Sequence, residues 1–269
     1  HAEPSFALYP QLAAAAGARD VAVPLAADGG HDLATMAALV DETTRLVVIC
    51  NPNNPTGVYR SAEAIEALLD DLPDDLAVLV DEAYNDFVTA PDSGRLMSLA
   101  RERGNLLVTR TFSKAHGLCG LRVGYGVGSP AWTAALQRVR PPFNTNALGQ
   151  AAARESLRHP AALAERVATT IAERERVAAA LSSTGMPFTP SQGNFMLLTP
   201  GADPGLGQRI HRRMLERGII LRDGTSLGCP GSLRVTVGTP AENNRLLDEL
   251  ADVFAAETAA TPGVERTAS

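Results

Sequence analysis

The sequence Arg110-Thr-Phe-Ser-Lys-Ala-His-Gly-Leu-Cys-Gly-Leu-Arg-Val-Gly-Tyr125 decides the fold of this chain and points to its chemistry. It follows an apolar run, 105–109, that predicts a buried strand ending in a loop of small residues. In this loop Lys114 stands beside the hydroxyls of Thr111 and Ser113, and an arginine opens the next apolar run. An amine flanked by hydroxyls and a guanidinium suits a phosphorylated aldehyde, which binds the lysine as a Schiff base and the other groups through its phosphate.

Two more polar loops follow apolar runs that predict buried strands. Val80-Asp-Glu-Ala-Tyr-Asn-Asp-Phe87 begins where the run 76–80 ends, and it places an acid and a phenol three residues apart. Cys50-Asn-Pro-Asn-Asn-Pro-Thr-Gly57 is an amide-rich turn that closes the run 45–50. Three polar loops at the carboxyl ends of strands fit the ligand crevice of an open α/β sheet.

The three motifs, in this order and spacing, resemble those of pyridoxal-phosphate (PLP) aminotransferases of fold type I. The Thr-Phe-Ser-Lys-Ala form of the lysine motif is most similar to that of the histidinol-phosphate aminotransferase branch. The resemblance extends from about Glu3 to about Phe254. It implies an α/β fold of the PLP-transferase type I class, with a mostly parallel central sheet, helices on both faces and a smaller carboxy-terminal α/β domain.

The resemblance assigns four residues to the reactive part of PLP. Lys114 would form the Schiff base and later carry the proton between the substrate and the cofactor. Asp81 would face the pyridine nitrogen and keep it protonated, so that the ring accepts electrons. Tyr84 and Asn54 would bind the phenolic oxygen of the ring. Other roles stay open, because Asp81 could cap a helix, Tyr84 could be a core aromatic and Asn54 a turn residue.

The rest of the cofactor site is implied in the same way. Phe6 matches the family position whose aromatic ring stacks on the cofactor, and core packing is its alternative role. No metal ion is expected, because the five histidines form no metal-binding motif. The phosphate would be held by Thr111, Ser113 and Arg122.

Three residues late in the chain are candidates for substrate binding. Arg222 and Arg234 lie in apolar runs that predict strands, where an arginine is costly unless an anion meets it. In the wider family the arginine that matches Arg234 binds the α-carboxylate of the substrate, whereas in the histidinol-phosphate branch the arginines here bind the substrate phosphate. A structural ion pair is the alternative for both. Asn194, in Gln192-Gly-Asn-Phe195, matches a residue of the active-site wall.

The composition of the chain argues against several other kinds of partner and cell compartment. Its 269 residues carry a net charge of −6, which argues against non-specific binding of nucleic acid. Cys50, Cys119 and Cys229 are odd in number and far apart, so we expect buried thiols in a reducing compartment rather than disulfides. Because no apolar run reaches ~20 residues and no signal peptide opens the chain, we expect a cytoplasmic enzyme with no membrane partner.

The order of apolar runs predicts a large PLP-binding domain at 1–158, a small domain at 159–257 and a disordered tail at 258–269. The boundary lies at His159-Pro160 because a long amphipathic helix follows it, and the charged run 173–176 is expected to face solvent. Expected strands are 21–25, 45–50, 76–80, 105–109, 123–127, 195–198, 219–221 and 233–237. Expected helices are 32–40, 61–69, one that starts at Pro130, 207–217 and 241–254.

The amino-terminal part of the family pattern is absent from the sequence. The chain begins at His1 without a methionine, and its first match to the pattern lies inside the large domain. Family members carry a preceding segment with a Gly-rich loop, whose amides bind the cofactor phosphate at a helix N-terminus. We therefore expect a truncated portion of a longer enzyme, and loss of part of the cofactor site is the alternative.

The resemblance predicts transfer of the amino group of L-histidinol phosphate to 2-oxoglutarate, by a homodimer that serves histidine biosynthesis. Aromatic amino acids are the nearest alternative donors, and threonine-phosphate decarboxylation is a third activity of the same fold. A truncated, non-catalytic relative that dimerises or only binds phosphorylated ligands would be a different class of protein. The enzyme is favoured because the chain retains Lys114, Asp81, Tyr84, Asn54 and Arg122 together.

Overall fold

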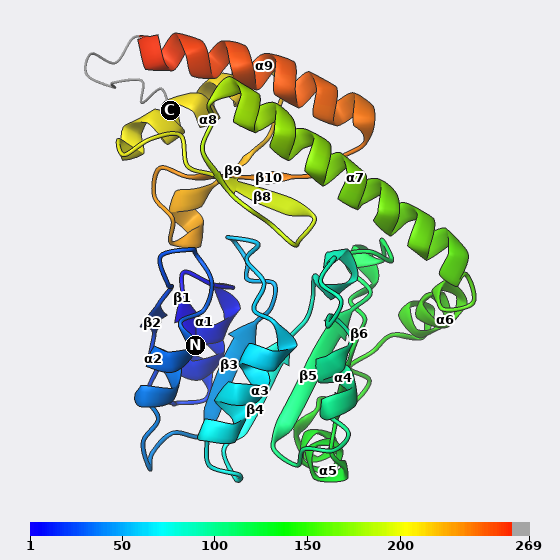
Figure 1. Ribbon diagram of the computed structural model, residues 1–269. Helices are drawn as coiled ribbons and strands as arrows, with labels where there is room; N and C mark the ends of the chain where they lie inside the picture. The colour runs from blue at the N-terminus through cyan, green and yellow to red at the C-terminus, as the bar shows by residue number, and fades with distance from the viewer. Residues whose placement is uncertain (260–269) are drawn as a thin grey trace.

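The larger sheet of the structure, a computed structural model that describes residues 1–259, has four strands (Figure 1). Their order across the sheet is β3 (Leu46–Cys50), β4 (Ala77–Asp81), β5 (Leu106–Thr111) and β6 (Gly124–Gly128). The first three strands are parallel, and β6 pairs antiparallel with β5. The mostly parallel central sheet expected from the sequence is therefore confirmed.

Two helices, one before β3 and one between β3 and β4, pack against the sheet. α2 (Leu33–Ala38) and α3 (Ala62–Asp71) begin at the predicted caps, because side-chain oxygens of Asp32 and Ser61 accept backbone N–H groups of the first turn. Ile65 of α3 is fully buried in the apolar cluster that both helices share with the strands. The elements from β1 to α6 form the amino-terminal half of the molecule, and those from α7 (Pro160–Thr184) onward form the carboxy-terminal half. The other elements of the amino-terminal half are β1 (Ala2–Glu3), α1 (Leu8–Ala15), β2 (Val23–Pro24), α4 (Arg95–Leu99), α5 (Pro130–Val139) and α6 (Ala147–Ser156).

A second sheet, entirely antiparallel, lies above the first in Figure 1 and is covered by three helices. Leu233 and Val235 are buried among these helices, so strand alternation turns Arg234, which lies between them, to the other face. That face is turned toward the larger sheet. The strand order is β7 (Phe188–Thr189), β8 (Phe195–Leu198), β10 (Leu233–Thr236) and β9 (Arg222–Asp223). The helices are α7 (Pro160–Thr184), α8 (Pro204–Glu216) and α9 (Pro240–Ala259).

The prediction of a strand at 219–221 is wrong. Gly218, just after α8, has a left-handed φ of +74°, and the Ile219 N–H donates a hydrogen bond of 2.9 Å to the Met214 carbonyl. These are the features of a helix that ends in a glycine turn, which uses the backbone groups that a strand would need. The strand therefore begins only at Arg222.

The end of the chain differs from the prediction in part. α9 extends to Ala259, so the expected tail is wrong at 258–259, and its remainder lies outside the described residues. The division of the chain between residues 158 and 159 stays a prediction, although α7 does begin at Pro160. Within residues 1–259, none of the helices has the length and apolar character needed to cross a membrane.

The charged run in the middle of α7 faces solvent only in part, because Glu175 and Arg176 are exposed as expected whereas the two residues before them are not. Glu173 and Arg174 are buried, at 8% and 5% exposure. The Arg174 guanidinium donates to the backbone carbonyls of Phe87 (2.9 Å) and Gly193 (3.0 Å), and the Glu173 carboxylate accepts from the Asn243 amide (2.8 Å). The prediction failed at these two residues because α7 packs against α9, where Asn243 lies, and because Arg174 hydrogen-bonds to a loop of each half of the molecule.

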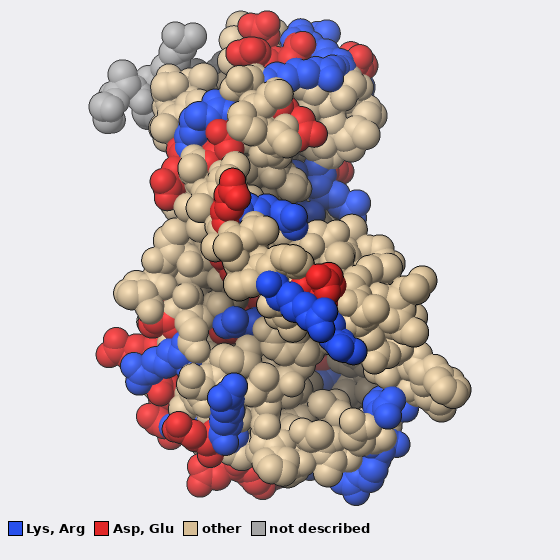
Figure 2. All heavy atoms as spheres, turned by 90° about the vertical axis from the view of Figure 1, so that its right-hand side faces the viewer, with Lys and Arg blue, Asp and Glu red and all other residues tan. Residues whose placement is uncertain are grey.

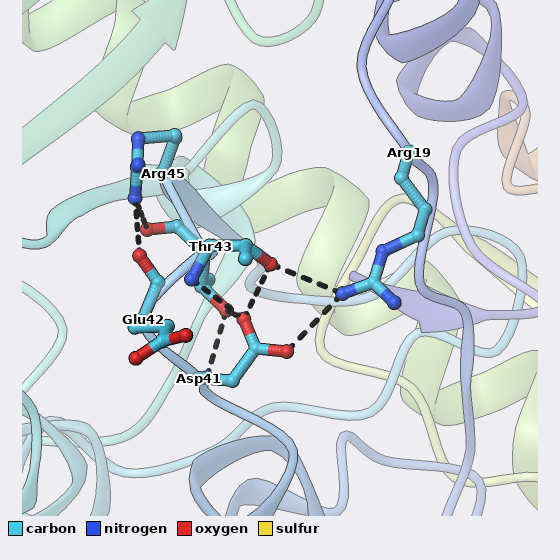
Figure 3. A network of polar contacts seen from close by, with 6 residues as sticks. Arg19, Asp41, Glu42, Thr43 and Arg45 are labelled. Atoms are coloured by element: carbon cyan, nitrogen blue, oxygen red, sulfur yellow. Dashed lines mark hydrogen bonds and ion pairs between the residues drawn. The ribbon is translucent and has the colours of Figure 1, made fainter.

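An exposed polar network holds loops at the amino ends of the strands (Figure 3). The Arg19 guanidinium donates to Asp41 and Thr43, at 3.2 Å each, and the Arg45 guanidinium donates to the Glu42 carbonyl at 2.8 Å. Exposed contacts of this kind contribute little to stability. Since Arg45 immediately precedes β3, the network lies at the edge of the sheet opposite to the three predicted motif loops.

Gly57 allows the loop 51–57 to close against the loop that leads into β8. Its φ is +79°, a left-handed conformation that glycine adopts without strain. The Gln192 N–H donates to the Gly57 carbonyl (2.8 Å), and a Cβ atom at Gly57 would overlap the Ser191 hydroxyl. Both the backbone angle and the close approach of the second loop therefore require glycine here.

Gly57→Ala should destabilise the protein more than Gly17→Ala. Both glycines have a left-handed φ, but no atom lies within 4 Å of a Cβ atom built on Gly17. The backbone angle lowers the free energy of unfolding by roughly 1–2 kcal/mol in either variant, and overlap with Ser191 lowers it further by on the order of 1–3 kcal/mol. Urea unfolding of both variants and the parent measures the difference, and equal losses would contradict the tight contact.

Candidate active site

The three motif loops all follow the carboxyl ends of strands of the larger sheet, so they begin on the same side of it. The parallel register pairs Cys50 with Asp81 and Asp81 with Thr109, so the strands end side by side. Lys114 lies in the loop that follows β5, which ends at Thr111, and so belongs to the same carboxyl end of the sheet. The polar loops therefore meet as the sequence predicts, because carboxyl ends of parallel strands share one side of a sheet.

Asp81 is held as a carboxylate acceptor at the end of β4. Its Oδ2 accepts a hydrogen bond from the Tyr9 hydroxyl (2.9 Å), and its Oδ1 accepts one from the Ala83 N–H (3.1 Å). Burial raises the pKa of the Asp81 carboxyl, while these hydrogen bonds and the charge of Lys114 act in the opposite direction. Asp81 does not cap a regular helix, since the short helix that follows has Tyr84 at its cap position.

Lys114 has an amine that neighbouring groups make easier to deprotonate. Its side chain is accessible to solvent, yet partial desolvation by the protein lowers the pKa, and the positive charges of Arg234 and Arg122 lower it further. The amine lies 5.1 Å from the centre of the Tyr84 ring. A lowered pKa enlarges the fraction of neutral amine, which is the nucleophilic form.

The predicted phosphate-binding residues lie together after β5. The Arg122 guanidinium donates to the Ser113 hydroxyl (3.3 Å) and to the Cys119 carbonyl (2.9 Å), and the Ser113 N–H donates to the Thr111 hydroxyl (3.0 Å). Arg122 has a left-handed φ of +56° and is exposed. Among residues 1–259 it forms no ion pair with a carboxylate. This cluster can therefore accept an anion.

The cysteines are free thiols in the described part of the chain, but not all are buried as expected. Cys50 is buried and Cys229 is half-buried, whereas Cys119 is exposed. Cys119 begins a short helical turn, Cys119–Leu121, that contributes no buried residue to the protein. Within residues 1–259, no three His, Cys, Asp or Glu side chains gather closely enough to hold a metal ion.

Arg234 joins the cofactor loops to the small sheet. Its guanidinium donates a hydrogen bond of 2.5 Å to the side-chain amide oxygen of Asn54, a residue 180 positions away in the sequence. This bond orients the amide, because only the amide oxygen of Asn54 can accept it, and it leaves the NH₂ group for another acceptor. Asn54 is therefore more than a turn residue. The Nε atom of Arg234 is buried and has no partner among the described residues.

Arg222 and Arg234 are direct cross-strand partners in the register of β9 with β10. Cross-strand partners point to the same face, so two positive charges lie next to each other there. Neither forms an ion pair within residues 1–259, so these residues give no support to the structural ion pair considered as their alternative role. Both line an open cavity of about 620 Å³, although Lys114 and Asp81 do not.

The structure connects Phe6 and Asn194 less directly to the other predicted site residues. The Phe6 ring is 40% exposed and meets the Tyr9 ring edge-on at 5.7 Å, so core packing does not describe its role. The Asn194 carbonyl accepts the Val237 N–H (2.9 Å) at the start of β8. Among the described residues, the Asn194 side chain has no hydrogen bond to the site, so its predicted role stays a prediction.

Sequence reasoning missed two aromatic residues of this site. The Tyr9 hydroxyl donates to Asp81, and the only sequence signal for it was its position three residues after Phe6. The Phe195 ring lies 4.9 Å from the Tyr84 ring and 5.2 Å from the Arg234 guanidinium carbon. Each contact joins segments far apart in the chain, so a local sequence pattern does not identify the partner.

The residues fit PLP. The amine of Lys114 suits an aldehyde, and the carboxylate of Asp81 suits a protonated pyridine nitrogen. The Nε atom of Arg234 is buried and has no hydrogen-bond partner within residues 1–259, as expected where a ligand supplies the acceptor. Hydroxyl and guanidinium donors for a phosphate lie beside the amine, in Thr111, Ser113 and Arg122.

Comparison with known proteins agrees with this chemistry. The family model for aminotransferase class I and II matches residues 2–250. The chain is 42% identical over 260 residues to histidinol-phosphate aminotransferase 2 of Ralstonia nicotianae, covering 97% of this chain and 69% of that protein. It is 43% identical over 243 residues to histidinol-phosphate aminotransferase 1 of Cupriavidus pinatubonensis, covering 90% of this chain and 64% of that protein.

A solved structure agrees as well. The crystal structure of histidinol-phosphate aminotransferase from Sinorhizobium meliloti in complex with pyridoxal-5'-phosphate matches with a TM-score of 0.87 at 29% identity, covering 95% of this chain and 70% of that one. The chain thus spans about two thirds of the length of these relatives. It belongs to the family of class I and II aminotransferases, which are PLP-dependent enzymes.

Proposed function

We propose that this protein transfers the amino group of L-histidinol phosphate to 2-oxoglutarate, a reaction of histidine biosynthesis. The pair Arg222 and Arg234 carries the proposal: two guanidinium groups on one face of the small sheet, neither with a carboxylate partner among the described residues. A phosphate monoester carries nearly two negative charges at neutral pH and matches such a pair. The names of the 42% and 43% identical relatives support the same donor.

Lys114 would act as the proton carrier of the reaction. Bound PLP supplies an aldehyde that takes up the amino group and a ring that accepts the electrons released at the donor carbon. Positioned next to that carbon, the Nζ atom of Lys114 would remove its proton and return it to the cofactor side. The lowered pKa of Lys114 supports this role, because a general base must be neutral near working pH.

Asp81, Tyr84 and Asn54 would hold the ring. The carboxylate of Asp81 would keep a proton on the pyridine nitrogen, and the hydrogen bond from Tyr9 would fix that carboxylate in position. The Asn54 NH₂ group, oriented by Arg234, and the Tyr84 hydroxyl would donate to the phenolic oxygen. Phe6 would stack on the ring, Asn194 would line the wall of the site, and Thr111, Ser113 and Arg122 would bind the cofactor phosphate.

A homodimer in the cytoplasm is part of the same proposal. Large apolar side chains are exposed on and between α5 and α6, which suggests a surface covered by another chain. Uncharged residues cover much of this side of the molecule (Figure 2). The most exposed of them are Val139 (77%), Phe143 (96%) and Leu148 (77%). The three free thiols support a reducing compartment.

The donor is tested by absorption spectroscopy of the protein with PLP and one amino donor, without any keto acid. An excess of L-histidinol phosphate should abolish the long-wavelength band of the bound cofactor, because the amino group passes to the cofactor and no added keto acid removes it. Lys114→Ala should not reach the amine form of the cofactor on addition of donor, because the lysine that would carry the proton is absent. A response to L-phenylalanine but not to L-histidinol phosphate would instead support an aromatic aminotransferase, and no cofactor band at all would support a non-catalytic relative.

Arg222→Ala and Arg234→Ala should each weaken binding of the phosphorylated donor. Loss of one charged hydrogen-bond donor to the phosphate should raise the donor KM about 10- to 100-fold. The same variants should discriminate less between L-histidinol phosphate and unphosphorylated L-histidinol, measured as the ratio of the two kcat/KM values. Arg45→Ala removes the same charge at the opposite edge of the sheet and is the matched control. An unchanged ratio in Arg234→Ala would refute the phosphate contact.

A further inference from the structure

Phe195 lies at the centre of a row of aromatic and cationic side chains. It is 2% exposed and is the first residue of β8. Its ring meets the Tyr84 ring edge-on, with centres 4.9 Å apart and planes at 77°. On its other side the Arg234 guanidinium carbon lies 5.2 Å from the ring centre, and Lys114 lies 5.1 Å from the centre of the Tyr84 ring.

Strand geometry explains why Phe195 faces the cofactor loops and not the core of the small sheet. It pairs with Thr236 across β8 and β10, and Arg234 lies two residues before Thr236, so both side chains share one face. Met196 and Leu198 point the other way, into the cluster under the helices. Phe195 instead packs in a separate apolar cluster with residues of the other half of the molecule: Tyr84, Phe87 and Ala115.

The ring restricts Arg234 where hydrogen bonds alone do not. An arginine side chain has several rotatable bonds and loses considerable entropy when it is fixed. Among the residues that the structure describes, only one of its donors is held, through the 2.5 Å bond to Asn54, and its Nε–H has no partner. A guanidinium over an aromatic face gains cation–π attraction, which is stronger where water is excluded. The ring therefore provides the second point of contact that fixes the guanidinium.

We propose that Phe195 is a positioning residue of the donor site: its ring holds the Arg234 guanidinium against Asn54 and supports the Tyr84 ring, so that the positive charge stays close to Lys114. This inference rests on the proposed role of Arg234 in donor binding. Neither the family match nor the site residues inferred from the motifs assign a role to Phe195. It acts through Arg234 and Tyr84 and makes no contact with the reacting atoms itself.

The test uses the fact that Lys114 is the only lysine of the chain. Protein labelled with ¹³Cε-lysine gives one resonance, and its pH titration in the absence of cofactor and donor reports the charge environment of that amine. Because Arg234 lowers the pKa of Lys114, displacement of the guanidinium should raise it. Phe195→Leu should therefore produce most of the upward shift that Arg234→Ala produces, and Phe195→Met, which also lacks the ring, should behave alike.

A double-mutant cycle separates positioning from packing. Once Arg234 is replaced by alanine, Phe195→Leu should cause little additional shift. Phe87→Leu makes the same change in the same apolar cluster without a contact to Arg234, so it should leave the Lys114 pKa unchanged. Thermal unfolding confirms that each variant is folded. An unshifted resonance in both Phe195 variants, or equal shifts with and without Arg234, would overturn the proposal.

Kinetic measurements then separate two claims: that Phe195 positions Arg234, and that Arg234 binds the donor. Phe195→Leu should raise the KM for L-histidinol phosphate about 3- to 30-fold, as expected for loss of a cation–π contact, with a smaller change in kcat. A shifted resonance with an unchanged KM would retain Phe195 as the residue that positions Arg234 and would refute the role of Arg234 in donor binding. A changed KM with an unshifted resonance would refute positioning by Phe195.

Discussion

The parallel, in-register pairing of β3, β4 and β5 is the constraint on which the site depends. It brings Cys50, Asp81 and Thr109 to one edge of the sheet, and with them the loops that carry Asn54, Tyr84 and Lys114. Register is strict because side chains alternate along a strand, so a slip of one residue would turn Asp81 to the opposite face. The buried apolar cluster between the strands and α3 fixes this register. The packing of the core residues thus determines where the chemical groups lie.

The hydrogen bond between Arg234 and Asn54 makes the two halves of the molecule one site. It ties the small sheet to a cofactor loop 180 residues away, while Arg174 of α7 bonds to one backbone carbonyl in each half. The buried Nε–H of this guanidinium has no partner in the described part of the chain, residues 1–259, so folding leaves a hydrogen bond unmade there until a ligand supplies the acceptor. This is the pattern expected of a binding site.

The sequence predicted what local patterns determine. Strand β8 begins and ends at the residues of the run 195–198, and Asp32 and Ser61 cap the helices they were expected to cap. It failed where tertiary contacts decide burial: Glu173 is buried beside Asn243 of α9, and Arg174 is buried between the two halves. Tyr9 and Phe195 were missed for the same reason, because their partners lie 72 and 111 residues away in the chain.

The most direct test of the central claim, that this chain holds PLP at Lys114, is borohydride reduction of the protein with PLP, followed by peptide mass spectrometry. Reduction makes the bond between the cofactor and an amine permanent, and the chain has a single lysine to receive it. One pyridoxyl group on the peptide that contains Lys114, and none there in Lys114→Ala, is the predicted result. An unmodified Lys114, or modification confined to the amino-terminal amine, would contradict the account.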